Sequence, residues 1–318
     1  MELLAAILPF FTAGVVGAAF ARFSGVNLSM CMLFIFLYMG ATPGEAIAAL
    51  LMFNTFTYFT TYSQNHDMSL GKLSIFPGAK IAIPIVITVA LAAVNPFFGI
   101  LVFVAAFLAE IFVRFYREAD GKTRPPKQTL WKLGGIASVF VILGLLVATL
   151  IPPAYYYILA GLVVLAYTAL MWFAADRRKW TNLWDSILYA TTFLTGLTGI
   201  AASDWLVPMH RTVQTTLSRF YPIISNGAMI VGLVASYIIF RTFTIGALFS
   251  LIGAAMVIRL FGITEHSTKG SFSYVAMGLA VLAALVFMII QPQPTGLPVM
   301  PVADDNGTLA QYLQSLGF

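Results

Sequence analysis

Residues 10–19 have the sequence FFTAGVVGAA and lie inside an apolar run, 3–21, that contains no charged side chain. A helix needs about 20 apolar residues to cross the hydrocarbon core of a bilayer, so this run is long enough to do so. Comparable runs follow at 45–63, 75–94, 97–116, 132–151, 154–174, 185–202, 222–240, 244–262 and 272–290. The pattern predicts an all-α polytopic membrane protein with about 10–12 transmembrane segments.

The composition supports this fold class. Hydrophobic residues make up 60% of the 318 positions and charged residues only 9%, whereas soluble domains carry about 25% charged residues. A compact soluble fold has too little interior to bury this much apolar surface, so lipid must cover the rest. Basic residues gather in two stretches, 114–132 and 176–184. Such clusters beside apolar runs are typical of cytoplasmic loops, and we expect no nucleic-acid interface.

Cysteine content and the first residues limit the chemistry and processing of the chain. Cys31 is the single cysteine, so neither an internal disulfide nor a thiolate metal cluster is expected. No basic region precedes the first apolar run. We therefore interpret 3–21 as the first span and not as a cleaved signal peptide.

Two segments depart from the regular pattern. Residues 26–39 are apolar but short, and residues 204–221 contain charged side chains and a proline. Irregular backbone at membrane depth is tolerated only inside protein or along a water-filled cavity, so we expect short or broken helices in both. The tail, 291–318, is predicted to be a soluble extension with a short amphipathic helix from Leu309 to Leu316.

The sequence also contains signs of an internal repeat. Residues 192–201, TFLTGLTGIA, align with residues 10–19 at an offset of 182 residues. Further matches follow in the same order. The paired positions are Gly14 with Gly196, Gly17 with Gly199, Asn54 with Asn226, Gly71 with Gly246, and Gly78 with Gly253.

These matches predict two related halves. We assign residues 1–116 to a first transmembrane repeat, 117–186 to a basic loop with a two-helix connector, 187–290 to a second repeat, and 291–318 to the tail. An odd number of crossings separates the starts of the two repeats, which makes them inverted. Inverted repeats with broken helices recur in secondary transporters, where the substrate binds near the midplane.

Each half has a Gly-x-x-Gly near the end of its first helix, an irregular segment, a helix with a central asparagine, and a Gly-x₆-Gly helix. This order resembles the sulfite exporter TauE/SafE family, the toluene-sulfonate uptake permease group. Ala18, Ala19, Ala201 and Ala202 stand where that family usually has further glycines. The resemblance implies a bacterial inner-membrane transporter that exports a small anion by alternating access. Sulfite, an organosulfonate or a related organic acid would be the substrate.

Polar side chains within the spans are the candidates for substrate binding, because a charge at the bilayer centre costs about 2.5–3.5 kcal/mol. Arg211, in the irregular segment, and Arg22 carry guanidinium groups that fit two oxygens of a sulfonate or carboxylate. Asn54 and Asn226 lie at matching mid-span positions and add amide donors. The alternatives are that Arg22 reaches the interface and that each asparagine only hydrogen-bonds a neighbouring helix.

Four glycines are expected to complete the substrate site through the backbone. Gly14, Gly17, Gly196 and Gly199 permit helix breaks. The N-termini of half-helices that follow such breaks would present N–H groups to an anion. Close packing between helices is the alternative role.

His210 and Asp204 are the candidates for proton coupling, because histidine titrates near neutrality and burial raises the pKa of a carboxyl. Asp204 as a helix cap and His210 as a donor to a carbonyl are the alternatives. Sodium is the other candidate coupling ion. Glu110 and Arg114, four residues apart, are predicted to form a structural ion pair.

Other classes of function fit the sequence less well. An enzyme would need a nucleophile with a base, or a metal with several ligands. His66, His210 and His266 are scattered, and no Walker-type phosphate loop is present. We therefore expect no catalytic centre, metal or cofactor. An anion channel, which uses the same basic groups, and a membrane scaffold or receptor subunit without transport stay as alternatives.

Overall fold

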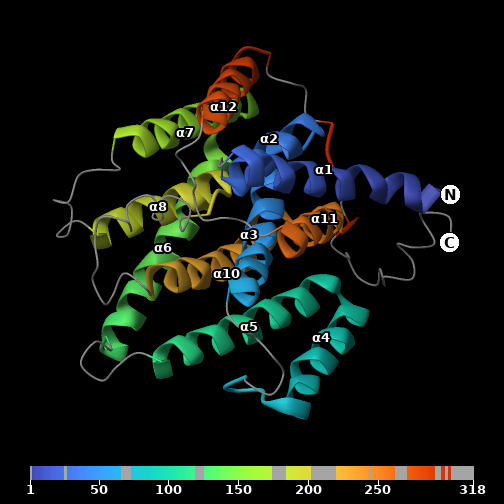
Figure 1. Cartoon of the computed structure of the whole chain (residues 1–318), viewed down its shortest axis with the longest axis vertical. Coiled ribbons are helices and arrows are strands. Elements are labelled where there is room, and N and C mark those ends of the chain that lie inside the picture. Colours follow the sequence, from blue (N-terminus) through green and yellow to red (C-terminus); the bar gives the residue numbers. More distant parts are fainter. Residues whose placement is uncertain are drawn as a thin grey trace.

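The computed structural model of the chain describes residues 2–24, 27–65, 73–118, 125–173, 184–201, 220–243, 245–261, 271–290, 295–297 and 300–301. Most of these residues are helical (Figure 1). The helices are α1 (Glu2–Ser24), α2 (Leu28–Tyr38), α3 (Pro43–Asn65), α4 (Ala82–Val94), α5 (Pro96–Glu118), α6 (Lys127–Leu150), α7 (Pro153–Phe173), α8 (Trp184–Thr198), α10 (Tyr221–Phe240), α11 (Ile245–Phe261) and α12 (Ser271–Ile290). Two short strands, β1 (Thr242–Phe243) and β2 (Met300–Pro301), pair antiparallel.

The described helices have the character of a membrane protein. By length and composition, α5, α6 and α10 are the three described helices that are long and apolar enough to cross a bilayer, and the apolar stretches described in other helices span 10–17 residues. Large apolar side chains are exposed on outer faces, including Val86 and Val89 of α4 and Ile289 of α12. Lipid would cover such faces. The predicted class, a helical membrane protein, agrees with these features.

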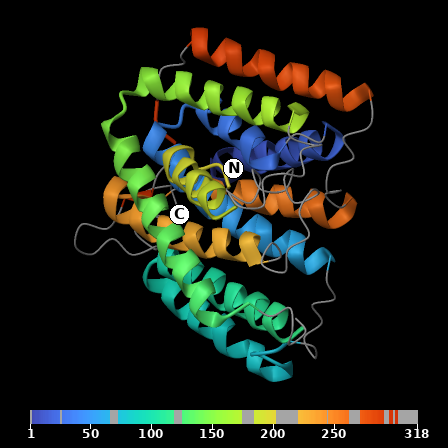
Figure 2. The same ribbon diagram turned by 90° about the vertical axis from the view of Figure 1, so that its left-hand side faces the viewer.

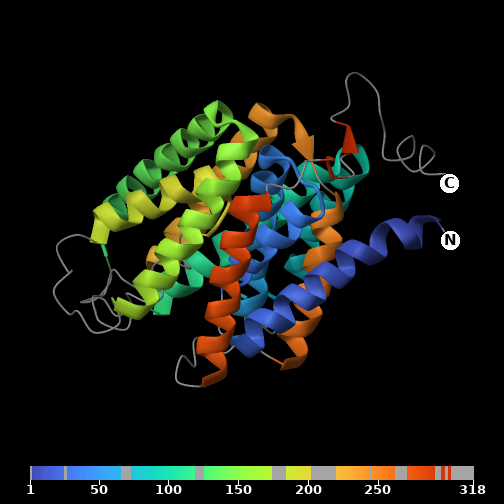
Figure 3. The same ribbon diagram turned by 90° about the horizontal axis from the view of Figure 1, so that it is seen from above.

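Helices α3 and α10 occupy the middle of the bundle. They pack against each other, and α3 also contacts α11 whereas α10 contacts α6. The α4–α5 hairpin lies at one end of the molecule, and α7 and α12 lie at the other end (Figures 1 and 2). On either side of this centre, α1 packs along α11 and α6 packs along α8 (Figure 3).

Glycines bring α1 and α11 into backbone contact. A Cβ added to Gly14 of α1 would overlap the carbonyl oxygen of Ser250 on α11. Conversely, a Cβ added to Gly253 of α11 would overlap the carbonyl oxygen of Phe11 on α1. Any larger residue would push the helices apart, so these glycines determine how closely the pair can pack.

The α6–α8 pair has the same kind of contact. A Cβ on Gly196 of α8 would overlap the carbonyl oxygen of Val141, and a Cβ on Gly144 of α6 would overlap that of Phe193. Gly14 and Gly196 therefore lie inside helices, where they permit close packing. In this pair, as in α1–α11, small residues replace side-chain interlocking with backbone contact.

Residues 26–39 contain a short helix, α2, as expected. The other helix boundaries agree with the apolar runs, with differences at two places. The run 75–94 contains a 3₁₀ turn, Gly78–Ile81, ahead of α4 instead of one continuous helix. Helix α8 ends at Thr198, before the end of the 185–202 run. The expected helix from Leu309 to Leu316 lies outside the described residues.

Part of the tail is docked on the start of α3. The Glu45 carboxylate, at the start of that helix, accepts the N–H of Thr42 at 2.8 Å and the N–H of Leu297 at 3.1 Å. The Gly296 N–H donates to the Gly40 carbonyl at 2.9 Å. Strand β2 then pairs with β1, next to the end of α10. These described pieces of the tail thus join the beginning of α3 to the end of α10.

Candidate functional site

The α3–α10 pair carries the candidate site. A Cβ on Gly44 of α3 would lie 2.7 Å from the Phe240 ring near the end of α10, and Gly232 of α10 approaches the Leu51 side chain of α3. The two helices therefore run antiparallel past each other. Asn54 lies about one turn beyond Leu51, and Asn226 lies before Gly232, so both asparagines are on the same side of this contact.

Asn54 holds the non-helical backbone that follows α8. Its side chain is 6% exposed, and its Nδ2 donates to the carbonyl oxygen of Gly199 at 2.7 Å. Without Asn54 this buried carbonyl would lack that partner. The interaction joins α3 to the point where α8 stops, 145 residues away in sequence.

The end of α8 is a built helix break. Gly199 has φ +78, which is the left-handed region that glycine adopts without steric penalty. The Thr198 hydroxyl accepts the N–H of Ile200 at 3.2 Å, and the Tyr156 hydroxyl donates to the Thr198 carbonyl at 3.3 Å. Ile200 and Ala201 are buried although they are not helical. In membrane proteins, irregular backbone within the bilayer is tolerated only where protein buries it or where it lines a water-filled cavity.

Ser225 and Asn226 differ from Asn54 because their polar side-chain atoms have no hydrogen-bond partner among the described residues. Their residues are 0% and 1% exposed. Within the described part of the chain, neither the Ser225 hydroxyl nor the Asn226 Nδ2 and Oδ1 atoms have a hydrogen-bond partner. An unpaired buried polar group costs about 1–3 kcal/mol, so native proteins normally satisfy such groups with water, an ion or a ligand. This pair is the strongest indication of a binding site in the described core.

Arg22, a predicted substrate-binding residue, has a structural contact. Its Nε donates to the carbonyl oxygen of Phe261 at 3.1 Å, at the C-terminus of α11. A guanidinium there satisfies an orphan carbonyl and interacts favourably with the helix dipole. Gly17 also lies inside a helix, since α1 continues past it to Ser24. Of the four glycines predicted to permit helix breaks, Gly199 is the one at a helix end.

Three predicted site residues, Arg211, His210 and Asp204, lie outside the described residues. The structure therefore brings together Asn54 and Gly199 from the predicted set. It places Asn226 on the same helix pair.

Two buried carboxylates, Glu110 and Glu45, accept backbone N–H groups, and these contacts were not predicted from the sequence. Glu110 is fully buried, and its carboxylate accepts the backbone N–H of Ser74 and, at 2.6 Å, that of Ile75. Its position four residues before Arg114 suggests an ion pair and carries no signal for this backbone contact. Glu45 belongs to a Thr-x-x-Glu capping box with Thr42, a pattern that is recognisable in the sequence.

Metal binding finds no support among the described residues, since no group of three His, Cys, Asp or Glu side chains there could hold an ion. No protein-family model, curated protein or solved structure matches this chain.

Proposed function

We propose that this protein is a secondary transporter, and more specifically an exporter, of a small anion such as sulfite, an organosulfonate or a related organic acid. The observation that carries the proposal is the buried Ser225–Asn226 pair in α10, whose polar side-chain atoms have no partner in the described part of the chain. In a transport site, polar groups of the protein are removed from water and form hydrogen bonds with the substrate when it binds. The bound solute would supply the partners that the described residues do not.

The chemistry of the central helices favours an anion. Asn226 and Ser225 offer N–H and O–H donors, and Asn54 holds the adjoining break. The two buried carboxylates, Glu45 and Glu110, each accept backbone N–H groups already. The segment that leads into α10 adds Arg211, whose guanidinium would bind two anion oxygens at once. In the proposal, His210 and Asp204 of the same segment couple transport to protons.

The glycine contacts support an internal repeat with a different boundary. Gly14 and Phe11 of α1 lie 182 residues before Gly196 and Phe193 of α8. The α1 residues pack against Ser250 and Gly253 of α11, and the α8 residues pack against Val141 and Gly144 of α6. Ser250 and Gly253 each lie 109 residues after the corresponding α6 residue. We therefore propose that α6 is the counterpart of α11. Gly78, with nothing near its Cβ position, does not share the close contact of Gly253.

This correspondence changes the expected moving parts. The first repeat would include α6, with α4 and α5 inserted into it, and α8 would begin the second. Each glycine-packed pair then combines one helix from each repeat: α1 with α11, and α6 with α8. Backbone contact makes each pair stiff. Alternating access would move these mixed pairs relative to each other, around α3 and α10.

Uptake into proteoliposomes tests the function. Labelled sulfite, taurine, sulfoacetate and a plain carboxylate are supplied to wild-type protein and to Asn226→Leu, with and without a proton or sodium gradient. Saturable, gradient-driven movement of one sulfur anion that the substitution abolishes is expected. Current that follows voltage without saturation would indicate a channel. No movement of any anion would contradict the proposal.

The same substitution separates a functional asparagine from a structural one. Leucine removes the unpaired amide of Asn226, so the free energy of unfolding should stay the same or rise. A variant that is stable but inactive supports the site. A variant that is unstable and inactive would indicate that Asn226 serves folding instead.

A further inference from the structure

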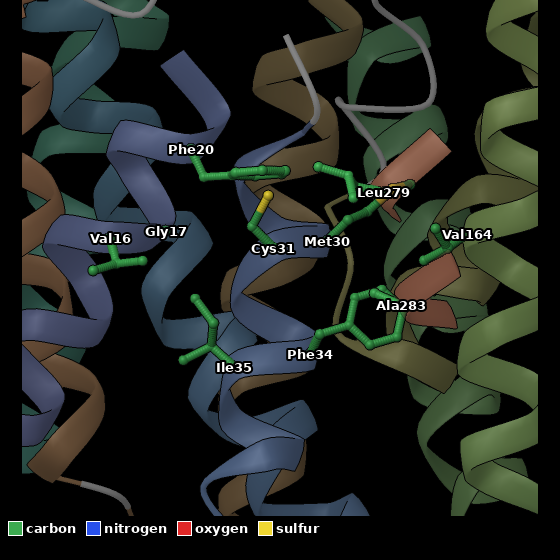
Figure 4. A pocket seen from close by; sticks show the side chains of 10 residues that line it. All are labelled: Val16, Gly17, Phe20, Met30, Cys31, Phe34, Ile35, Val164, Leu279 and Ala283. Carbon is green, nitrogen blue, oxygen red and sulfur yellow. The ribbon is translucent and has the colours of Figure 1, made fainter. Parts of the chain in front are cut away.

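A cavity lies away from the α3–α10 centre, between the α1–α2 pair and the α7–α12 pair (Figure 4). Its volume is about 330 Å³. The side chains that line it are aliphatic, aromatic or sulfur-containing, and none carries a charge or an amide. No described feature of the proposed transport site reaches it.

The cavity runs from the outer surface into the core. At its rim, Val16 of α1 and Leu279 of α12 are 61% and 51% exposed. At its inner wall, Met30 of α2 and Val164 of α7 are each 1% exposed. Because the rim residues belong to the exposed apolar surface, the cavity is continuous with the face that lipid would cover.

Close packing ends the cavity on one side. The rings of Phe34 on α2 and Phe287 on α12 are 5.2 Å apart. Next to them, Gly161 of α7 is packed against the side chain of Met288. One turn away from Gly161, at Val164, the space between α7 and α12 opens. Helix α12 packs mainly on α7 and α1, so the cavity leaves its contact with α2 incomplete.

We infer that an acyl chain of a membrane lipid occupies this cavity. Water gains no hydrogen bonds among apolar walls, and apolar cavities stay dry for that reason. A polar solute would lose its own hydrogen bonds there without compensation. A hydrocarbon chain fits the lining and enters directly from the bilayer, and the volume falls within the range of about 300–1,000 Å³ found for ligand sites. The chain completes the packing of α12 against α2.

Photochemical cross-linking tests the occupant. The full-length protein is reconstituted in phosphatidylcholine vesicles that contain phosphatidylglycerol with a diazirine-bearing acyl chain, and the labelled peptides are identified by mass spectrometry. Label on Met30 and Val164 is expected. A lipid that only coats the outer surface would not reach these two side chains.

Two matched variants sharpen the result. Ala283→Phe fills the cavity from α12, whereas Ala166→Phe makes the same change at an exposed position on α7. Label at Met30 should fall about tenfold in Ala283→Phe. The phenyl ring would exclude about two methylene groups of the acyl chain from the cavity, and the lost burial of two such groups lowers occupancy by about this factor. It should not change in Ala166→Phe. Equal reduction by both variants, or wild-type label confined to exposed faces, would overturn the inference. The wild-type pattern decides by itself if Ala283→Phe fails to fold.

Cys31 gives an independent measurement because it lines the cavity and is the chain's single cysteine. Added phosphatidylglycerol should slow its reaction with N-phenylmaleimide in delipidated protein. A cysteine at the exposed position Leu282, in a Cys31→Ser background, controls for general coating by lipid. Equal slowing at both positions would contradict occupation of the cavity.

Discussion

Helices α1 and α8 contain the same Gly-x-x-Gly spacing and the same glycine-to-carbonyl packing, yet they end differently. Helix α1 continues from Gly17 to Ser24, whereas α8 stops at Thr198 and Gly199 turns to φ +78. The difference lies in what the surroundings supply. Asn54 and Tyr156 donate to the carbonyls of Gly199 and Thr198. A glycine permits a helix break, and buried partners for the released carbonyls stabilise it.

The largest effect is expected at the first glycine of the Gly-x-x-Gly motif, which packs against a backbone carbonyl in both helices. Gly14→Ala and Gly196→Ala each place a Cβ on a backbone oxygen of the partner helix. Because no side chain can move aside, each should lower the free energy of unfolding by about 3 kcal/mol or more. Thermal unfolding in detergent, followed by circular dichroism, measures the loss. Gly135→Ala, at an exposed position of α6 with nothing within 4 Å, is the control and should be slightly stabilising.

The second glycine of the motif should distinguish the helices. Gly199→Ala forces alanine into the left-handed region and places its Cβ 2.8 Å from that of Leu50. At Gly17 the helix is ordinary and the nearest atom is the sulfur of the flexible Met32 side chain, at 2.6 Å. The unfolding free energy should fall by about 1–2 kcal/mol more for Gly199→Ala than for Gly17→Ala. Equal losses would mean that the break does not depend on the left-handed conformation.

The two asparagines give a matched pair. Asn54→Leu leaves the buried Gly199 carbonyl without its donor and should cost about 1–3 kcal/mol of unfolding free energy. Asn226→Leu removes an amide that has no partner among the described residues, so it should cost nothing or stabilise. Denaturation of both variants side by side checks the difference. Similar losses in both would indicate that Asn226 has a structural partner.

The smallest effect is expected at the docked tail. Glu45→Gln keeps an acceptor oxygen but removes the charge that strengthens the bonds from Thr42 and Leu297. The loss should be about 1 kcal/mol, the difference between hydrogen bonds to charged and neutral groups. Limited proteolysis of residues 291–318 should become faster than in the wild type. An unchanged rate would mean that Glu45 does not hold the tail.

Much of the fold could be predicted from hydropathy, because each long helix with an apolar surface appears in the sequence as an apolar run, whether that surface is buried or exposed. The break at Gly199 was also predictable from glycine. The continuation of α1 past Gly17 could not be predicted. Whether a helix breaks depends on hydrogen-bond donors to the released carbonyls, and at the end of α8 these donors come from α3 and α7, far away in the sequence.

The site was predictable in its residue types more than in its contacts. The position of Asn226 in an apolar run marks it as a candidate, but only the structure distinguishes its unpaired amide from the bonded amide of Asn54. Arg22 shows the opposite case. A charged side chain in a span suggests a functional role. The contact of Arg22 with the Phe261 carbonyl at the C-terminus of α11 accounts for its charge equally well.

The central claim, that Asn226 binds the transported anion, is tested most directly by ligand-dependent thermal unfolding. Purified wild type and Asn226→Leu are titrated with sulfite, taurine and sulfoacetate. One anion should stabilise the wild type, by about 2.7 kcal/mol at a hundred times its dissociation constant. Asn226→Leu should begin at an equal or higher midpoint and show no shift. The same shift in both proteins would contradict the assignment of Asn226 to the binding site.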